Sequence, residues 1–184
     1  MVYISRGNTL LDPQALLLRL GLKAGDRIAN LGCGGSGHFT AAAARLVGDK
    51  STVYIVDILK SALKTTASKA RLEGLTNIKS IWSNLEIAGA TNIPENSLNF
   101  AFIVNVLFES KKQENILAEA RRLLKPGGKL LVVDWSQTSA PFGPPQASRV
   151  NLADIQNSAQ KLNLKLIDQF QAGPYHFGLI FQKS

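Results

Sequence analysis

The most restrictive feature of the sequence is a glycine-rich segment near the N-terminus. The stretch NLGCGGSGHF, residues 30–39, carries four glycines within six positions. It follows the apolar run RIANL and leads into HFTAAAARLV, whose residues are good helix formers. A packed core has no need of so many missing side chains, whereas a turn that approaches a ligand does. The segment therefore predicts a turn between a first strand and a helix, with backbone N–H groups facing a nucleotide or a similar polar ligand.

Segments typical of strands and helices alternate along most of the remaining chain. Runs of β-branched, aliphatic and aromatic residues predict strands, and helix formers between glycine and proline signals predict helices. The predicted strands cover residues 27–32, 52–58, 77–83, 98–106, 129–135, 165–171 and 176–182. The predicted helices cover residues 12–21, 36–48, 59–74, 110–125 and 151–164.

Three of these helices carry recognisable end signals. Asp12 is an expected N-cap with Pro13 in the first turn, and Asn151 is expected to cap the last helix. Ser110 and Gln113 have the spacing of a capping box. The apolar face behind that box is predicted to consist of Ile116, Leu117, Ala120, Leu123 and Leu124.

The order of these segments predicts the fold class. Alternation of strand and helix indicates an α/β fold with a Rossmann-like, doubly wound, mostly parallel sheet of seven strands. The turn AGPY before the last strand is too short for a crossover, so we expect one antiparallel edge strand. A length of 184 residues suits one domain, residues 1–184, which includes a short N-terminal helical segment within residues 1–26. Residues 1–11 are expected to be irregular.

Composition excludes several classes of protein. Cys33 is the only cysteine, so the sequence holds no internal disulfide and no Cys/His cluster for a metal. No apolar run is long enough to span a bilayer, and MVYISRGNTL lacks the apolar core of a secretory signal. A cytoplasmic protein is therefore expected.

The charge balance leaves an acidic partner open. The net charge is +8, which is compatible with binding to nucleic acid. Lysines and arginines are nevertheless spread over most of the chain, which favours a solvated surface. Their densest group, in one predicted helical segment, is Lys111, Lys112, Arg121, Arg122 and Lys125.

The glycines also fit a dinucleotide-binding pattern. Gly32, Gly34 and Gly37 satisfy G-x-G-x-x-G, and Asp57 lies 20 residues beyond Gly37 at the end of the second predicted strand. A carboxylate there can accept hydrogen bonds from both ribose hydroxyls. An NAD oxidoreductase is disfavoured, because the chain is short for a second nucleotide half and no tyrosine has a lysine one helical turn later.

Several longer segments carry a family resemblance. RIANLGCGGSGHFT, VYIVDI, WSNLE, LNFAFIVNVLFES and EARRLLKPGGKLLVVDW occur in a characteristic order and spacing. In these segments the chain resembles class I S-adenosylmethionine-dependent methyltransferases, and is most similar to the small ubiquinone/menaquinone-biosynthesis-like branch. The resemblance covers residues 10–183 and implies the sheet predicted above, methyltransferase activity and S-adenosylmethionine as cofactor. LLKPGG is its most discriminating element.

The resemblance also implies roles for individual residues. The turn from Asn30 to Gly37 would wrap the methionine part of the cofactor, and Asp57 would hold the ribose. Ile58 would pack on the adenine, and Asn84 and Leu85 would meet its edge. The end of the fourth strand, residues 105–107, would pass beside the methionine part and face the acceptor. The cofactor-binding set implied in this way is Asn30, Gly32, Cys33, Gly34, Gly37, Asp57, Ile58, Asn84, Leu85 and Asn105.

The sequence departs from the family pattern in three ways. Asn30, Asn84 and Asn99 stand where relatives often have aspartate, so negative charge that would attract the cofactor's ammonium and sulfonium is missing. The glycine turn is one residue longer than the common form, and Phe108 replaces a frequent histidine. We expect that the cofactor still binds, but more weakly than in acid-bearing relatives.

No residue is an obvious catalyst, and methyl transfer mainly requires alignment in a dry pocket. Asp134 is a weak catalytic candidate, as a base or an acceptor-orienting group, and a loop-capping role explains it equally well. Trp135 is a candidate stacking wall. In the proline-rich loop 136–150, Phe142 is a candidate apolar contact for the acceptor and Arg149 a candidate contact for an anionic group. Glu109 lies near the expected acceptor side, where a solvated carboxylate is an equal explanation.

The acceptor stays open at this level: a small molecule, a protein or an RNA, with a homodimer as one way to enclose a small acceptor. NVLF, residues 105–108, is not the motif used on exocyclic amines of nucleic-acid bases. The alternative to an enzyme is a non-catalytic module of the same fold that binds RNA or protein through its basic surface.

Overall fold

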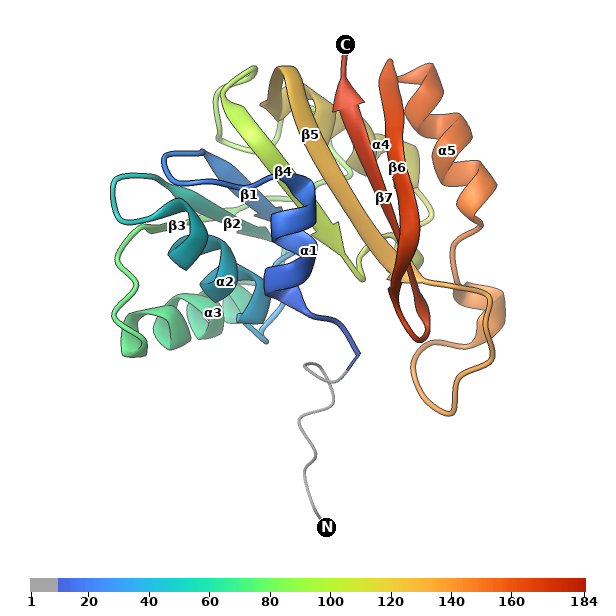
Figure 1. Cartoon of the computed structure of the whole chain (residues 1–184), viewed down its shortest axis with the longest axis horizontal. Helices are drawn as coiled ribbons and strands as arrows, with labels where there is room; N and C mark the ends of the chain where they lie inside the picture. The colour runs from blue at the N-terminus through green and yellow to red at the C-terminus, as the bar shows by residue number, and fades with distance from the viewer. Residues whose placement is uncertain (1–9) are drawn as a thin grey trace.

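The computed structural model describes residues 10–184, and the part of the expected irregular segment at residues 1–9 lies outside them. Seven strands form one sheet in the order β3-β2-β1-β4-β5-β7-β6 (Figure 1). The strands are β1 (Ile28–Leu31), β2 (Val53–Asp57), β3 (Ile78–Trp82), β4 (Leu98–Val104), β5 (Leu124–Trp135), β6 (Leu164–Gly173) and β7 (His176–Lys183). The helices are α1 (Pro13–Leu20), α2 (His38–Val47), α3 (Lys60–Leu72), α4 (Gln113–Leu123) and α5 (Leu152–Lys161), with short 3₁₀ turns η1 (Leu107–Glu109) and η2 (Gln146–Ser148).

Strand direction confirms the predicted fold class. β1 pairs in parallel with β2 and with β4, and the parallel pairing continues outward to β3 and β5. β7 runs antiparallel to both β5 and β6. The reversed strand therefore lies one place inside the edge, with β6 outside it, because the short turn after β6 brings β7 back between β6 and β5.

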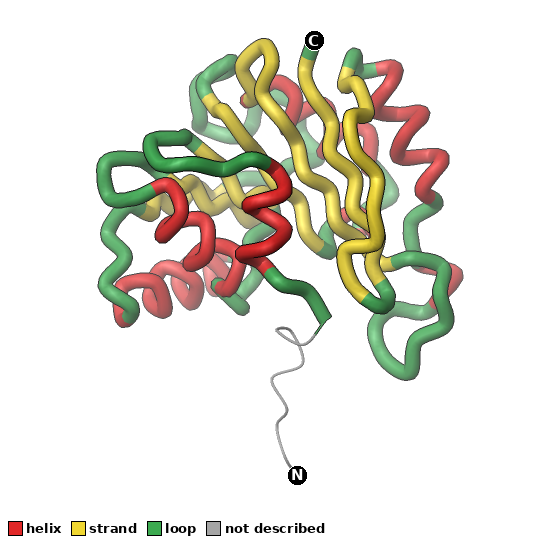
Figure 2. The backbone as a smooth tube through the Cα atoms, in the orientation of Figure 1, coloured by secondary structure: helices red, strands yellow, loops and turns green. Residues whose placement is uncertain are grey.

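Helices cover both faces of the sheet (Figure 2). On one face α1 and α2 pack with Ile28, Val53 and Phe102, and on the other α4 and α5 pack with Leu31 and Leu130. Successive residues of a strand point to opposite faces, so central strands that are covered on both sides are apolar throughout. β1 and β2 are accordingly buried at every position. Across residues 10–184, no helix is long and apolar enough to cross a membrane.

The helix ends confirm two of the three predicted cap signals. Asp12 accepts a hydrogen bond from the N–H of Ala15, and Asn151 accepts one from the N–H of Ala153. The predicted capping box is wrong. Helix α4 begins at Gln113 with Lys112 as N-cap and without a side-chain cap. Instead, Ser110 Oγ accepts from the N–H of Lys112 at 2.9 Å, and both side chains of the expected box donate to residues that precede the helix.

Those contacts attach the start of α4 to the loops around it. Ser110 Oγ donates to Glu86 Oε1 at 2.6 Å, and Gln113 Nε2 donates to the carbonyl of Leu107 at 3.0 Å. The predicted apolar face of α4 is correct, since Ile116, Leu117, Ala120, Leu123 and Leu124 are all buried. Leu124 lies just beyond the helix, as the first residue of β5.

Glu119 anchors the loop between β3 and β4 from helix α4. Its side chain is buried and accepts hydrogen bonds from the N–H groups of Gly89 and Thr91, at 2.9 and 3.0 Å. Arg122 lies on the same carboxylate at 2.7 Å. These donors outweigh the cost of burial and lower the pKa of Glu119 to about 2.

We predict that Glu119→Gln lowers the free energy of unfolding by about 2–3 kcal/mol at pH 7, because two N–H donors and Arg122 lose an ionised partner. The folded pKa lies below the ordinary 4.5, so the contribution is present above about pH 4.5 and is lost as the pH falls toward 2. Urea denaturation of wild type and variant at pH 7 and pH 3 measures the change. Glu114→Gln, an exposed change on the same helix, should alter stability by less than about 0.5 kcal/mol. A loss independent of pH would contradict the prediction.

Candidate functional site

The glycine turn follows β1 directly and is held against β2. The N–H groups of Gly32 and Cys33 both donate to the carbonyl of Val56, at 2.8 and 3.0 Å. Gly32 has φ +79°, and a Cβ at this position would lie 2.5 Å from Cγ2 of Val106. Only glycine meets both the left-handed backbone and this close approach. The turn is therefore shaped by the segment after β4 as well as by its own sequence.

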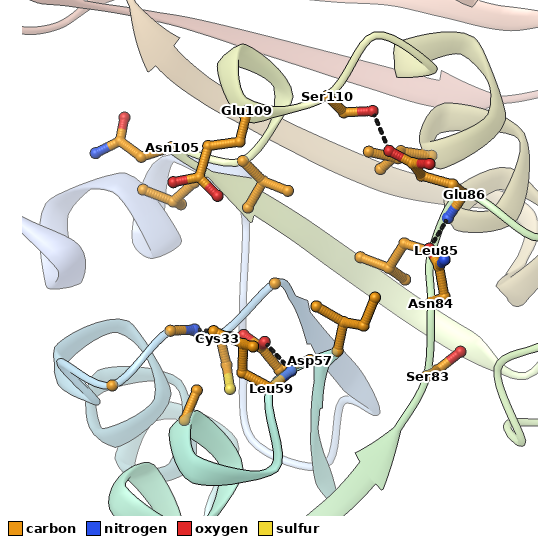
Figure 3. A pocket seen from close by; sticks show the side chains of 18 of the residues that line it. Cys33, Asp57, Leu59, Ser83, Asn84, Leu85, Glu86, Asn105, Glu109 and Ser110 are labelled. Atoms are coloured by element: carbon orange, nitrogen blue, oxygen red, sulfur yellow. Dashed lines mark hydrogen bonds between the residues drawn. The ribbon is translucent and has the colours of Figure 1, made fainter. Parts of the chain in front are cut away.

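Asp57 connects this turn to the next one. One carboxylate oxygen accepts from the N–H of Gly34 at 2.9 Å, and the other accepts from the N–H of Leu59 at 2.8 Å. A carboxylate has about four lone-pair positions, so two backbone donors leave acceptor capacity for a ligand. Figure 3 shows the side chain among the residues that line the cavity. A pair of sugar hydroxyls is the kind of donor that fits there.

Helix α3 supports the outer part of the turn, which the sequence did not reveal. Thr66 Oγ1 donates to the carbonyl of Gly34 at 2.7 Å. Lys69 Nζ donates to the carbonyls of Gly35 and Ser36, at 2.8 and 3.2 Å. The added length of this turn is thus held by two side chains that lie about thirty residues further along. Helical spacing of Thr66 and Lys69 is the only local signal, and it is not specific.

A cavity of about 620 Å³ opens at the carboxyl ends of the central strands, where ligands bind in open α/β sheets. Eight of the ten predicted cofactor residues line it: Gly32, Cys33, Gly34, Asp57, Ile58, Asn84, Leu85 and Asn105. The lining residues that the sequence did not assign to the cofactor include Leu59, Ala62, Ser83, Glu86, Glu109, Ser110 and Ile116 (Figure 3). They come from α3, the β3–β4 loop, η1 and α4, which only the fold brings together.

Two predicted residues lie beside this cavity rather than in its wall. Asn30 is buried, donates from Nδ2 to Thr40 Oγ1 at 3.0 Å, and lines a neighbouring cavity of about 90 Å³. Gly37 is the N-cap of α2 with φ +78°. Asn99 is at the opposite end of the sheet, where its side chain accepts from the N–H of Arg27. Asn99 therefore does not contact the cavity, and the absence of a charge on its side chain has no direct effect there.

Asn105 stands where β4 gives way to η1. Its φ of +56° lies in the left-handed region, which asparagine tolerates better than most residues. Its N–H donates to the carbonyl of Val133 at 2.9 Å, while its side-chain oxygen has no partner among residues 10–184. This bend carries Val106 toward Gly32 and places η1 over the cavity.

Asp134, the weak catalytic candidate, is not among the described residues that line the cavity. Its side chain is fully buried, and it accepts from the N–H groups of Leu107 and Trp135 at 2.9 and 2.8 Å. Burial raises its pKa to about 6, although these donors act in the opposite direction. The geometry supports the capping alternative, with the difference that Asp134 holds η1 after β4 rather than the loop that follows it.

The proline-rich loop folds onto Trp135 instead of forming an acceptor wall. Arg149 is 8% exposed and donates to the carbonyls of Ser136 and Thr138, with its guanidinium 5.4 Å from the Trp135 ring. Arg149 is thus engaged by its own loop and is not among the residues that line the cavity, so its contact with an anionic group of the acceptor stays a prediction. His176 packs on Trp135 at 4.3 Å, and burial lowers its pKa to about 4, which indicates a structural role.

Cys33 lines the cavity but is poorly suited to nucleophilic chemistry. Burial, together with the negative charge of Asp57, raises the pKa of its thiol to about 12. The reactive form of cysteine is the thiolate, which this environment disfavours. Cys33 is therefore a wall residue. None of the residues from 10 onward forms a group of His, Cys, Asp and Glu suited to a metal ion.

Comparison with known proteins identifies the family. The sequence profile of the ubiE/COQ5 methyltransferase family matches residues 15–147, which include the glycine turn, Asp57 and every wall of the cavity. The chain belongs to the ubiE/COQ5 methyltransferase family. The predicted class of S-adenosylmethionine-dependent methyltransferases, with that cofactor, is confirmed at the level of the family.

Two curated relatives carry the name ubiquinone/menaquinone biosynthesis C-methyltransferase UbiE. Those of Erwinia tasmaniensis and Photorhabdus laumondii are each 37% identical to this chain over 118 residues. Each match covers 64% of this chain and 45% of the relative. The similarity thus spans less than half of these longer proteins.

Solved structures agree on the fold over nearly the whole chain. A SAM-dependent methyltransferase from Aquifex aeolicus superposes with a TM-score of 0.89 at 23% identity, covering 98% of this chain and 94% of that one. Phosphoethanolamine N-methyltransferase 2 of Haemonchus contortus, solved with S-adenosyl-L-methionine, has a TM-score of 0.75 at 16% identity and covers 93% and 52%. At these identities the likeness establishes a Rossmann-like methyltransferase fold.

We predict that Asp134 makes stability fall as pH rises. Its folded pKa is about 6 against an ordinary 3.8, so its contribution is present below about pH 3.8 and is lost as the pH rises through 6. The free-energy difference between wild type and Asp134→Asn should therefore shrink by about 2–3 kcal/mol from pH 4 to pH 7. Urea denaturation across this range measures it. Asp154→Asn on an exposed face of α5 is the control, and a flat difference for Asp134→Asn would refute the burial argument.

Proposed function

We propose that this chain transfers a methyl group from S-adenosylmethionine to a small-molecule acceptor within the cavity of about 620 Å³. The observation that carries the proposal is the meeting of the glycine turn and the Asp57 carboxylate on one wall of that cavity. Family membership supports the same chemistry. Residues 1–184 would act as one methyltransferase domain in the cytoplasm. A homodimer remains a prediction.

The residues of the cavity fit the cofactor. A Cβ at Gly34 would meet no other atom within 4 Å, so the backbone of the turn is open to a ligand at this position. Asp57 offers anionic acceptors for the ribose hydroxyls, and Ile58, which is 55% exposed, offers an apolar face for the adenine opposite Leu85. The proposed binding set is the predicted one, in which Asn30 and Gly37 hold the turn and its helix from behind: Asn30, Gly32, Cys33, Gly34, Gly37, Asp57, Ile58, Asn84, Leu85 and Asn105.

The chemistry asks little of the protein beyond alignment. S-adenosylmethionine supplies a methyl group already activated on a sulfonium, so the chain has to bind, orient and exclude water. Val106 and the η1 segment form the wall on the β4 side, where the acceptor would be admitted. The relatives named UbiE are C-methyltransferases of quinone biosynthesis, which supports a small organic acceptor over a protein or an RNA.

A label-transfer experiment tests the reaction. Purified protein, in excess over S-adenosylmethionine labelled in the methyl group, is incubated with a cell extract separated into small molecules, RNA and protein. Label is expected in the small-molecule fraction within a single turnover. Label in RNA or protein alone would contradict the acceptor class. Salt-dependent RNA binding without any transfer would favour the non-catalytic module and refute the enzyme.

We predict that Asp57→Ala weakens binding of S-adenosylhomocysteine at least tenfold, because charged hydrogen bonds to the sugar and the anchor of Gly34 are both lost. Isothermal titration calorimetry measures the dissociation constants. Asp154→Ala, a change of the same kind on an exposed helix position, should leave binding unchanged. An unaltered dissociation constant for Asp57→Ala would mean that the ligand lies elsewhere.

A further inference from the structure

The cavity carries charge of one sign only. Asp57, Glu86 and Glu109 line it, and none of the described lining residues is lysine, arginine or histidine. The chain as a whole has a net charge of +8, so the negative charge of this wall is opposite in sign to the charge of the whole protein. A concave wall of one sign focuses its field on the ligand.

Two of the three carboxylates already have partners. Asp57 accepts from the N–H groups of Gly34 and Leu59. Glu86 accepts from Ser110 Oγ at 2.6 Å, and its other oxygen lies 3.7 Å from Lys112 Nζ. Their charge is partly offset by these donors, and their orientation is set by the protein.

Glu109 is different. Its backbone N–H donates to the carbonyl of Val106, which fixes η1, but its carboxylate has no partner within residues 10–184. Figure 3 shows the side chain extending from η1 into the cavity, on the side away from Asp57 and Cys33. The base of η1 is held in turn by the bond from Leu107 N–H to the buried Asp134. A free negative charge is thus presented at a defined place, the β4 side of the cavity.

We propose that Glu109 recognises positive charge at the methyl-transfer end of the cavity, so that the protein binds the sulfonium cofactor in preference to its neutral thioether product. This inference rests on the proposed function. A carboxylate attracts the sulfonium of S-adenosylmethionine but has no net charge to attract on the sulfur of S-adenosylhomocysteine. Glu109 therefore favours uptake of the charged cofactor and release of the product.

The same carboxylate narrows the acceptor class to neutral nucleophiles. During transfer, the acceptor's electron pair forms the new bond to the methyl carbon, and the carbon–sulfur bond breaks with its pair remaining on sulfur. Positive charge passes from sulfur to the acceptor, where Glu109 can offset it until a proton leaves to solvent. An anionic acceptor would be repelled by three carboxylates and meet no lining cation.

Binding measurements test the inference without knowledge of the acceptor. We expect Glu109→Gln to weaken binding of S-adenosylmethionine by about three- to fivefold, the range for a partly solvated charge pair, and to change binding of S-adenosylhomocysteine by less than twofold. Glu109→Asp keeps the charge and should retain most of the preference. Glu114→Gln changes the net charge equally, on an exposed part of α4 that does not line the cavity, and should alter neither constant.

The outcomes separate the two proposals. An unchanged ratio of the two dissociation constants in Glu109→Gln, or an equal loss for both ligands, overturns the role of Glu109 while the cofactor site stands. Wild-type protein that binds neither ligand overturns the proposed function, and the role of Glu109 with it. Thermal unfolding of each variant at the same pH shows whether the substitution has altered the fold, which the exposed position of Glu109 argues against.

Discussion

The hydrogen bond from Gly34 N–H to Asp57 is the contact on which the site depends. It forms because β1 and β2 pair in parallel with Leu31 beside Val56, so their next residues enter the same space. The carboxylate is at once a structural acceptor for two turns and part of the wall of the cavity. A residue in this position shapes the backbone around the ligand and offers the ligand its own oxygens, so positioning and binding are hard to separate by mutation.

A second aspartate, Asp134, also accepts a hydrogen bond from a turn that follows a neighbouring strand, on the other side of the cavity. Asp134 is the last residue but one of β5 and accepts from the N–H of Leu107 in the turn after β4, much as Asp57 at the end of β2 accepts from the turn after β1. The two differ in exposure, since Asp57 lines the cavity and Asp134 is fully buried. One carboxylate therefore faces the cavity, and the other supports the segment that carries Glu109.

The structure also shows where the three asparagines that depart from the family pattern lie relative to the cavity. Asn99 lies at the far end of its strand, and Asn30 supports Thr40 behind the turn. Asn84 alone among the three lines the main cavity. The asparagines lack negative charge, but other residues supply it. Glu86 lines the same cavity from the β3–β4 loop, and Glu109 lines it from η1. Electrostatic attraction for a cationic ligand thus depends on the summed wall and not on single positions.

The sequence by itself determined the order of strands and helices along the chain, the doubly wound sheet and the glycine turn, since these follow from local periodicity and backbone freedom. It also named eight of the residues that line the cavity. It failed at the start of α4, where the apparent capping box of Ser110 and Gln113 serves contacts with Glu86 and Leu107. It also could not show that Thr66 and Lys69 brace the turn, that Arg149 is enclosed by its own loop, or that Glu109 is left free. These outcomes were decided only by the tertiary structure, because the partners of a polar side chain depend on how the loops and helices fold. Some partners, such as Glu86 for Ser110 and Gly34 for Thr66, lie far away in the sequence.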